Sequence, residues 1–207
     1  MKALAIDPAV RATLRGGVSL LFAWAAIHKV RDRAAFRSAL ASYELLPSRW
    51  IGAFALVVIV LEGSIATGLW VPALTVMSAA TAAALQAVYA GAIGINLLRG
   101  RRDIDCGCVG VAGKRPLSGM LVGRNAVLIA AALVLALPAD ARAMTWLDGI
   151  TITAGVAALA LLYAVVDGLL ANAPKTAALA GEHSLHRGGR ARLGPPHIHG
   201  YTEDVHA

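Results

Sequence analysis

Two cysteines separated by one glycine, Cys106-Gly107-Cys108, are the residues of this chain best suited to do chemistry. A pair at this spacing can close only a small, strained disulfide ring, and Gly107 supplies the backbone freedom that the closure requires. Strained disulfides are more oxidising and exchange readily, which suits a redox pair. The flanking charges act in opposite directions, because nearby arginines favour the thiolate while Asp103 and Asp105 oppose it.

Two other interpretations of the cysteine pair stay open. The cysteines can be unreactive small residues in a glycine-rich turn. They can also bind a metal, but two thiolates leave a tetrahedral zinc ion two ligands short, and no histidine lies nearby in the sequence. We therefore favour a thiol–disulfide pair and predict no metal site.

Three further polar residues fall inside apolar runs, where they are costly. An ionised Glu62 near the middle of a span costs roughly 2.5–3.5 kcal/mol to insert, so it should face the bundle interior, either protonated or paired. It can serve as a proton relay or support a bound quinone, or it can make an interhelical hydrogen bond that fixes packing. Arg124 and Asn125 lie about two turns into a later span. The Arg124 guanidinium can stabilise a cysteine thiolate, or it can extend to the head-group level.

The histidines of the C-terminal region are a weaker candidate for a metal site. They lack regular ligand spacing, and a disordered tail explains them adequately. These residues are His183, His186, His197, His199 and His206.

The elements that must hold these residues are membrane spans. Hydrophobic residues make up 58% of the 207 residues and charged residues 15%, whereas a soluble domain carries about 25% charged residues. All eight prolines lie outside the centres of the apolar runs, so they mark element boundaries. We predict an all-α polytopic membrane protein: a five-span helical bundle with one interfacial helix and a disordered C-terminal tail. The predicted spans are about residues 10–28, 51–70, 73–98, 119–137 and 148–170.

The segments between the spans complete the predicted organisation. Asp7 should N-cap the first span before Pro8, and Ser118 should N-cap the fourth. Residues 29–50 form a basic segment whose Phe36, Leu40 and Tyr43 share one helical face, which is typical of an interfacial helix. The cysteines lie in the loop 99–118, residues 1–172 form the bundle, and residues 173–207 form the tail.

Basic residues predict the orientation of the bundle. The net charge of +7 would favour nucleic acid in a soluble protein, but these charges lie between apolar runs, so we expect a lipid bilayer and no nucleic-acid partner. Fourteen basic residues fall on one side of the predicted bundle and four on the other. The bias predicts an inner-membrane protein with its N-terminus outside, and with its C-terminus and the cysteine loop inside.

The run Asn96-Leu-Leu-Arg-Gly-Arg-Arg-Asp-Ile-Asp-Cys-Gly-Cys108 resembles the signature of the MauE proteins of methylamine utilisation. These proteins belong to a wider class of DoxX-like, redox-associated membrane proteins. Other pieces agree in order: the run from Phe36 to Tyr43-Glu-Leu-Leu-Pro47, then Glu62, then Arg124-Asn125. The resemblance covers roughly residues 12 to 172 and leaves out the histidine-rich tail.

The resemblance implies an accessory protein for the maturation of methylamine dehydrogenase. The implied client is the small subunit, which is rich in disulfides and carries a quinone made from its own tryptophans. The implied partner is a thioredoxin-like maturation protein. Cys106 and Cys108 would be the redox pair, which makes the chain a thiol–disulfide oxidoreductase or an accessory factor. Oxidation of one thiol pair needs an outside acceptor, either the partner or a membrane quinone.

Two interpretations of a different class stay open. The chain can be a non-catalytic scaffold that binds the client or the thioredoxin-like partner. It can also be a small-molecule or metal carrier that uses Glu62. The predicted orientation also conflicts with an exported client. Three explanations of this conflict stay open. Electrons can pass across the bundle from thiols on the inside, the loop can lie deep enough to be reached through the bundle, or the charge rule can fail for this chain.

Overall fold

The computed structural model describes residues 5–104 and 117–192, and most of these residues lie in helices. Apart from a single bridge between Ile6 and Ala139, the described ranges contain no β-structure. The elements in chain order are α1 (Pro8–Arg31), α2 (Arg33–Ser42), α3 (Ser48–Gly68), the 3-10 turn η1 (Pro72–Leu74), α4 (Thr75–Leu98), α5 (Gly119–Leu135) and α6 (Trp146–Arg192).

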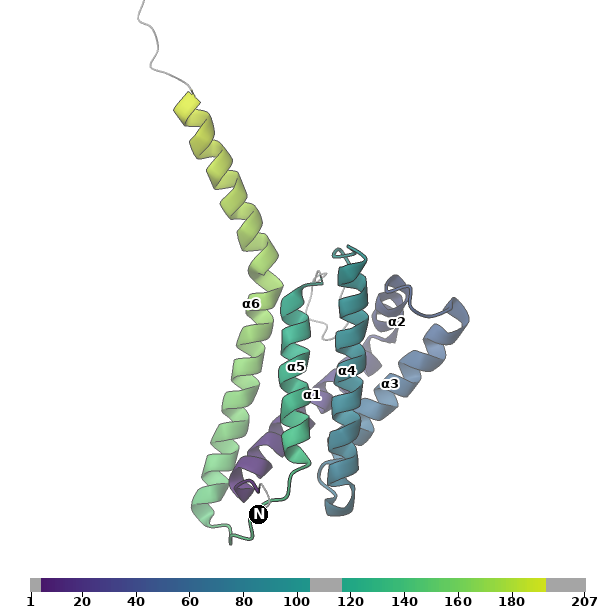
Figure 1. Cartoon of the computed structure of the whole chain (residues 1–207), viewed down its shortest axis with the longest axis vertical. Helices are drawn as coiled ribbons and strands as arrows, with labels where there is room; N and C mark the ends of the chain where they lie inside the picture. The colour runs from purple at the N-terminus through teal and green to yellow at the C-terminus, as the bar shows by residue number, and fades with distance from the viewer. Residues whose placement is uncertain (1–4, 105–116, 193–207) are drawn as a thin grey trace, which may run out of the picture. The chain divides into compact units, whose positions relative to one another are not determined.

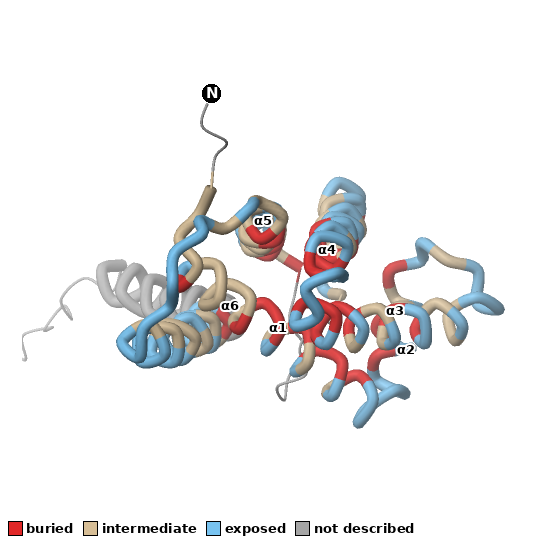
Figure 2. The backbone as a smooth tube through the Cα atoms, turned by 90° about the horizontal axis from the view of Figure 1, so that it is seen from below, coloured by how far each residue is buried: buried red, intermediate tan, exposed pale blue. Residues whose placement is uncertain are grey.

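The chain divides into two compact units, Met1–Val165 and Val166–Ala207. In the first unit, α4 packs along α5, α1 crosses behind them, and α3 packs against both α1 and α4 (Figure 1). Buried residues concentrate where these helices face one another (Figure 2). The main core joins residues of α1, α3, α4 and α5, including Phe22, Ile65, Ala82 and Leu135.

Four described helical segments are long and apolar enough to cross a membrane: Pro8–Arg31, Ser48–Gly68, Pro72–Leu98 and Trp146–Leu169. They correspond to the first, second, third and fifth predicted spans. The fourth predicted span is α5, which is apolar but has only 17 residues, so it rises about 26 Å at 1.5 Å per residue. The structure thus supports four spans of full length and a fifth, shorter apolar helix.

Local sequence explains the helix boundaries. Pro8 begins α1, and Asp7 caps it by accepting a hydrogen bond from the Ala9 amide at 2.8 Å, as predicted. The turn at Pro72 joins α3 to α4, between the second and third predicted spans. Ser118 occupies the N-cap position of α5, but its side chain makes no capping hydrogen bond to the described residues.

Two helices extend beyond the predicted ends. The first span was predicted to end near His28, but α1 continues to Arg31 because the charge of Lys29 is buried and paired inside the bundle. α6 continues past residue 170 to Arg192, so residues 173–192, which we predicted to be disordered, are helical. Alanine, leucine and glutamate in this stretch favour a helix.

The amphipathic segment contains the helix α2, whose apolar face is covered by protein, and its location at a membrane interface stays a prediction. Phe36 packs with Ala55 and Val58 of α3, and Leu40 packs beside them. This contact holds α2 against the first half of α3.

Candidate functional site

A buried ion pair inside the bundle joins Glu62 of α3 to Lys29 of α1. The Lys29 Nζ donates to Glu62 Oε1 at 2.7 Å and to Oε2 at 2.9 Å. Their side chains are 4% and 1% exposed. The Tyr89 hydroxyl of α4 also donates to Glu62 Oε1, at 2.7 Å. Glu62 therefore faces the interior and is paired, which is one of the two states that the sequence predicted.

Aromatic rings complete the surroundings of Lys29. Its ammonium nitrogen lies 5.2 Å from the centroid of the Phe36 ring and 5.7 Å from that of Tyr89. Both distances are in the range of cation–π attraction. Because Phe36 belongs to α2, the network joins four helices, α1 to α4, at one point.

Helix periodicity brings these residues together. In α1, Lys29 continues the buried face that carries Phe22 and Ala25. In α3, Glu62 lies on the buried face with Val58 and Ile65. Repeats of three and four residues place such positions along one side of a helix. Lys29 and Glu62 therefore occupy core positions of α1 and α3.

The network binds helices together, and a role of Glu62 as a proton relay stays a prediction. Two Lys29 hydrogen bonds and one Tyr89 hydrogen bond engage the Glu62 carboxylate. Both Lys29 and Tyr89 therefore donate to the same carboxylate, which is the shared acceptor of the network. The three hydrogen bonds of this network do not include Arg124 or Asn125.

Cys106 and Cys108 lie outside the described residues, but the two ends of their loop are described. α4 ends at Leu98, and Gly100 adopts a left-handed conformation with φ 75°. The Gly100 amide donates to Leu97 O and the Arg101 amide to Asn96 O, both at 3.0 Å. This pattern is a Schellman cap, in which glycine supplies the positive φ.

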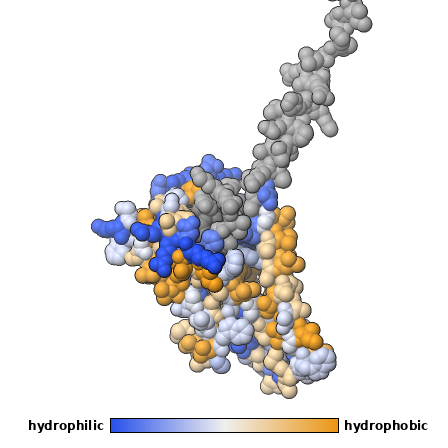
Figure 3. All heavy atoms as spheres, turned by 180° about the vertical axis from the view of Figure 1, so that it is seen from behind, coloured by the Kyte–Doolittle hydropathy of each residue, from blue (hydrophilic) through white to orange (hydrophobic). Residues whose placement is uncertain are grey.

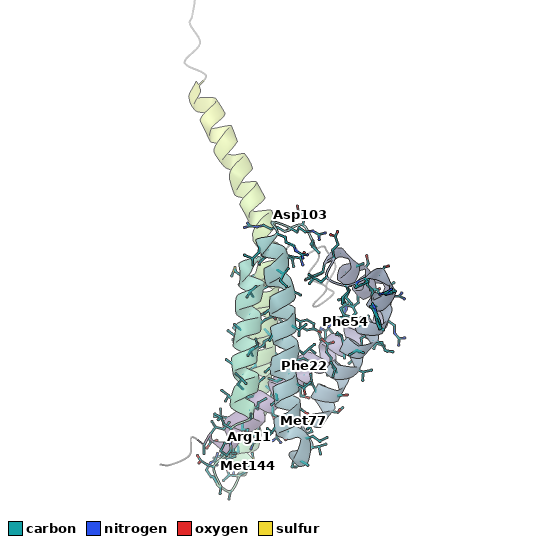
Figure 4. The ribbon with its side chains drawn as sticks, turned by 45° about the vertical axis from the view of Figure 1, so that its right-hand side comes forward. Arg11, Phe22, Phe54, Met77, Asp103 and Met144 are labelled. Atoms are coloured by element: carbon teal, nitrogen blue, oxygen red, sulfur yellow. The ribbon has the colours of Figure 1, made fainter. Side chains whose placement is uncertain are left out.

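Hydrogen bonds close the base of the cysteine loop. The Leu117 amide donates to Arg102 O at 2.8 Å. The Arg101 guanidinium donates to Glu44 Oε1 at 2.7 Å and to Ser42 O at 3.2 Å. The start of the loop is therefore attached to its end and to the C-terminal end of α2. Asp103, labelled in Figure 4, lies at the opposite end of the bundle from Arg11 and Met144.

Arg124 and Asn125 lie on α5. The Arg124 guanidinium stacks 5.8 Å from the ring centroid of Tyr163 on α6. Asn125 is 1% exposed, and its Nδ2 has no hydrogen-bond partner among the described residues. The predicted contact between Arg124 and a cysteine thiolate stays a prediction, because the cysteines are not described.

Sequence reasoning missed Lys29 and Tyr89, and it noted Asn96 only as the first residue of the MauE-like run. Lys29 was counted among the basic residues of a loop, although its place on the same helical face as Phe22 was a usable signal. Asn96 is fully buried at the last turn of α4, and its Oδ1 has no hydrogen-bond partner in the described ranges. Nothing in the sequence indicated that Tyr89 would reach Glu62. The described residues contain no group of three or more metal-ligating His, Cys, Asp or Glu side chains.

Comparison with known proteins identifies the family. The family model described as methylamine utilisation protein MauE matches residues 7–138, a stretch that contains the Glu62 network and the cysteine loop. A methylamine utilization protein MauE from Paracoccus denitrificans is 42% identical over 160 residues, which are 76% of this chain and 86% of that protein. The MauE of Methylophilus methylotrophus is 36% identical over 182 residues, 85% of this chain and 93% of that protein. No solved structure matches the chain. The match across the bundle shows that this chain belongs to the MauE family of methylamine utilisation proteins.

Proposed function

We propose that this protein is a multi-pass inner-membrane accessory protein that helps to form disulfides in the methylamine dehydrogenase small subunit. The observation that carries the proposal is the Cys106-Gly107-Cys108 pair, in a loop whose base is closed by the hydrogen bond between Leu117 and Arg102. Membership of the MauE family supports a role in methylamine utilisation. The apolar helices support a site at a membrane surface.

The proposed chemistry is thiol–disulfide exchange. A client thiolate attacks the Cys106–Cys108 disulfide, a mixed disulfide forms, and the second client thiol resolves it. The client gains a disulfide, and this chain is left with two thiols. Reoxidation passes two electrons and two protons to an acceptor, either a thioredoxin-like partner in its disulfide form or a membrane quinone.

Replacing both cysteines tests the redox step. We expect the C106S/C108S variant to insert normally and to lose client maturation, measured as the disulfide state of the small subunit and as dehydrogenase activity. The matched control is V111S, which places a serine in the same loop and keeps both thiols. Full client maturation with the double variant would refute the redox step and would favour a non-catalytic scaffold.

The basic residues support an orientation with the N-terminus outside and the cysteine loop inside. In that orientation an exported client reaches the pair only if electrons cross the bundle or the loop is reached through it; otherwise the charge rule fails for this chain. Arg101 joins the loop to the end of α2, so both basic segments lie at one end of the bundle. Lys29 does not count toward this bias, because it is buried and paired. Labelling Cys106 and Cys108 in intact cells with membrane-permeant and impermeant thiol reagents tests the orientation. We expect the permeant reagent to label the two cysteines and the impermeant reagent to leave them unlabelled.

The carrier function is less well supported by the geometry. Lys29 engages both carboxylate oxygens of Glu62, and Tyr89 engages one of them. A cargo ion or molecule would have to displace these donors before it could bind. The second candidate function is therefore the scaffold.

A further inference from the structure

A groove separates α2 from the beginning of α3, at the end of the bundle that carries the cysteine loop. It is open to the surface and has a volume of about 380 Å³. The residues that line it are Ala34, Arg37, Ser38, Ala41, Ser48 and Ile51. One charged group, two hydroxyls and three apolar side chains therefore meet in the same groove.

Helix spacing and one glycine create this arrangement. Ala34, Arg37, Ser38 and Ala41 follow at three- and four-residue steps, so they share one face of α2. Arg37 extends across the groove toward α3, where its Nη2 lies 3.5 Å from the point that a Cβ at Gly52 would occupy. The missing side chain at Gly52 leaves room for the guanidinium.

Arg37 has no ion-pair partner within the described part of the chain. The two nearby carboxylates have other partners. Asp32 caps α2 by accepting from the Ala35 amide at 2.9 Å, and Glu44 pairs with Arg101 at 2.7 Å. A guanidinium that keeps its five N–H donors unpaired beside two hydroxyls is suited to bind an anion with several oxygens.

The position of the groove indicates that this anion belongs to a lipid head group. α3 is an apolar helix of 21 residues that begins at the groove, so the groove lies where a span enters the head-group region. Trp50 is 56% exposed in the first turn of α3, as is usual for tryptophan at a membrane interface. Arg33 and Arg49 are exposed nearby, and Figure 3 shows hydrophilic side chains gathered at this end of the molecule.

We propose that the groove binds an anionic phospholipid. Arg37 binds the lipid phosphate through two parallel hydrogen bonds, and the hydroxyls of Ser38 and Ser48 donate to its remaining oxygens. Ala41 and Ile51 contact the glycerol and the start of an acyl chain. The site does not depend on the thiol chemistry proposed above.

The test compares lipid retention by the full-length protein and its variants. The protein is purified in detergent, exchanged into mixed micelles with phosphatidylglycerol or phosphatidylcholine, and examined by native mass spectrometry. We expect the wild-type protein to retain phosphatidylglycerol in preference to phosphatidylcholine. We expect R37Q to weaken phosphatidylglycerol binding about tenfold, which is 1.4 kcal/mol. The matched control R33Q removes the same charge from the same helix outside the groove and should change binding less than about twofold.

Three results would overturn the proposal. Equal losses of phosphatidylglycerol binding in R37Q and R33Q would show that the lipid is attracted diffusely to basic residues. Displacement of the lipid by millimolar inorganic phosphate at constant ionic strength would show a site for the free anion. Unchanged phosphatidylglycerol binding by A41L, which narrows the groove and keeps every charge, would show that the lipid binds elsewhere. Because A41L leaves Arg37 in place, it tests the groove even if R37Q fails to fold.

Discussion

At the scale of single residues, Lys29 and Glu62 stabilise the bundle only as a pair. Taking either charge out of water costs several kcal/mol, and the attraction between the two charges offsets this cost only where the geometry is good. Here both carboxylate oxygens are engaged, and two aromatic rings surround the ammonium. Removal of one partner leaves the other charge buried without compensation.

The pair predicts an unusual order of variant stabilities. E62Q and K29M should each lower the free energy of unfolding by about 3–5 kcal/mol, because each leaves an unpaired buried charge. The double variant K29M/E62Q should be more stable than either single variant, because no charge remains. Unfolding in mixed micelles, followed by circular dichroism, measures the order. Additive losses in the double variant would contradict the ion-pair interpretation.

At the scale of helices, α6 approaches α1 through residues that have no side chain. A Cβ at Gly16 would lie 2.7 Å from Val156 Cγ2, and a Cβ at Gly155 would lie 2.6 Å from Thr13 Cγ2. Small residues allow such close helix packing in membranes, where the hydrophobic effect does not drive helices together. Two glycines on opposite helices thus determine how closely this pair packs.

A methyl group at Gly16 should separate α1 from α6. Valine is β-branched and stiff at χ1, so Val156 cannot turn away easily, and we expect G16A to cost about 1–3 kcal/mol. The matched control is G123A on α5, where a Cβ meets nothing within 4 Å. That change should be neutral or should stabilise the helix by about 0.5–1 kcal/mol. Thermal unfolding in detergent compares the two variants, and equal midpoints would contradict the close contact.

Sequence predicted these helices well where the signal was local. Proline and capping residues located the beginning of α1 at Pro8 and the boundary between α3 and α4 at Pro72, because both effects act within a few residues. The end of α1 was predicted too early because a charge at position 29 usually indicates a loop. Glu62 lies beside Lys29 only because α1 and α3 cross, and no rule about neighbouring residues predicts that crossing. The contact of Tyr89 with Glu62 could not be predicted for the same reason.

At the scale of the whole first unit, hydrogen bonds close both ends of the bundle. One end is held by Arg101 and the Leu117–Arg102 bond. At the other, Arg142 donates to Asp7 at 3.0 and 3.1 Å and to Asp148 at 2.8 and 2.9 Å. This arginine connects the N-cap of α1 to the first turn of α6.

The Arg142 contact predicts a stability change in acid. Its hydrogen bond to Asp7, with a second from the Ala9 amide, lowers the pKa of Asp7 below the ordinary 3.8. A lowered pKa means that the stabilisation is complete above pH 3.8 and is lost as the pH falls through the folded-state value. D7N keeps an N-cap residue but loses the charge, so wild type should be more stable at pH 7, and the difference should shrink as the pH falls below 3.8 through the lowered pKa of Asp7. Thermal unfolding between these pH values measures it, and a constant difference would contradict this role.

The order of Lys29 and Glu62 along the chain also has a consequence for biosynthesis. Lys29 lies near the end of α1, so its long side chain can reach the head groups while α1 is alone in the membrane. Glu62 is the fifteenth of the 21 residues of α3, and its short side chain cannot reach either surface. Because α1 is synthesised first, the cation is already in the bilayer when the carboxylate enters it. We therefore expect Lys29 to offset part of the cost of inserting Glu62, so that the insertion of α3 depends on the helix made before it.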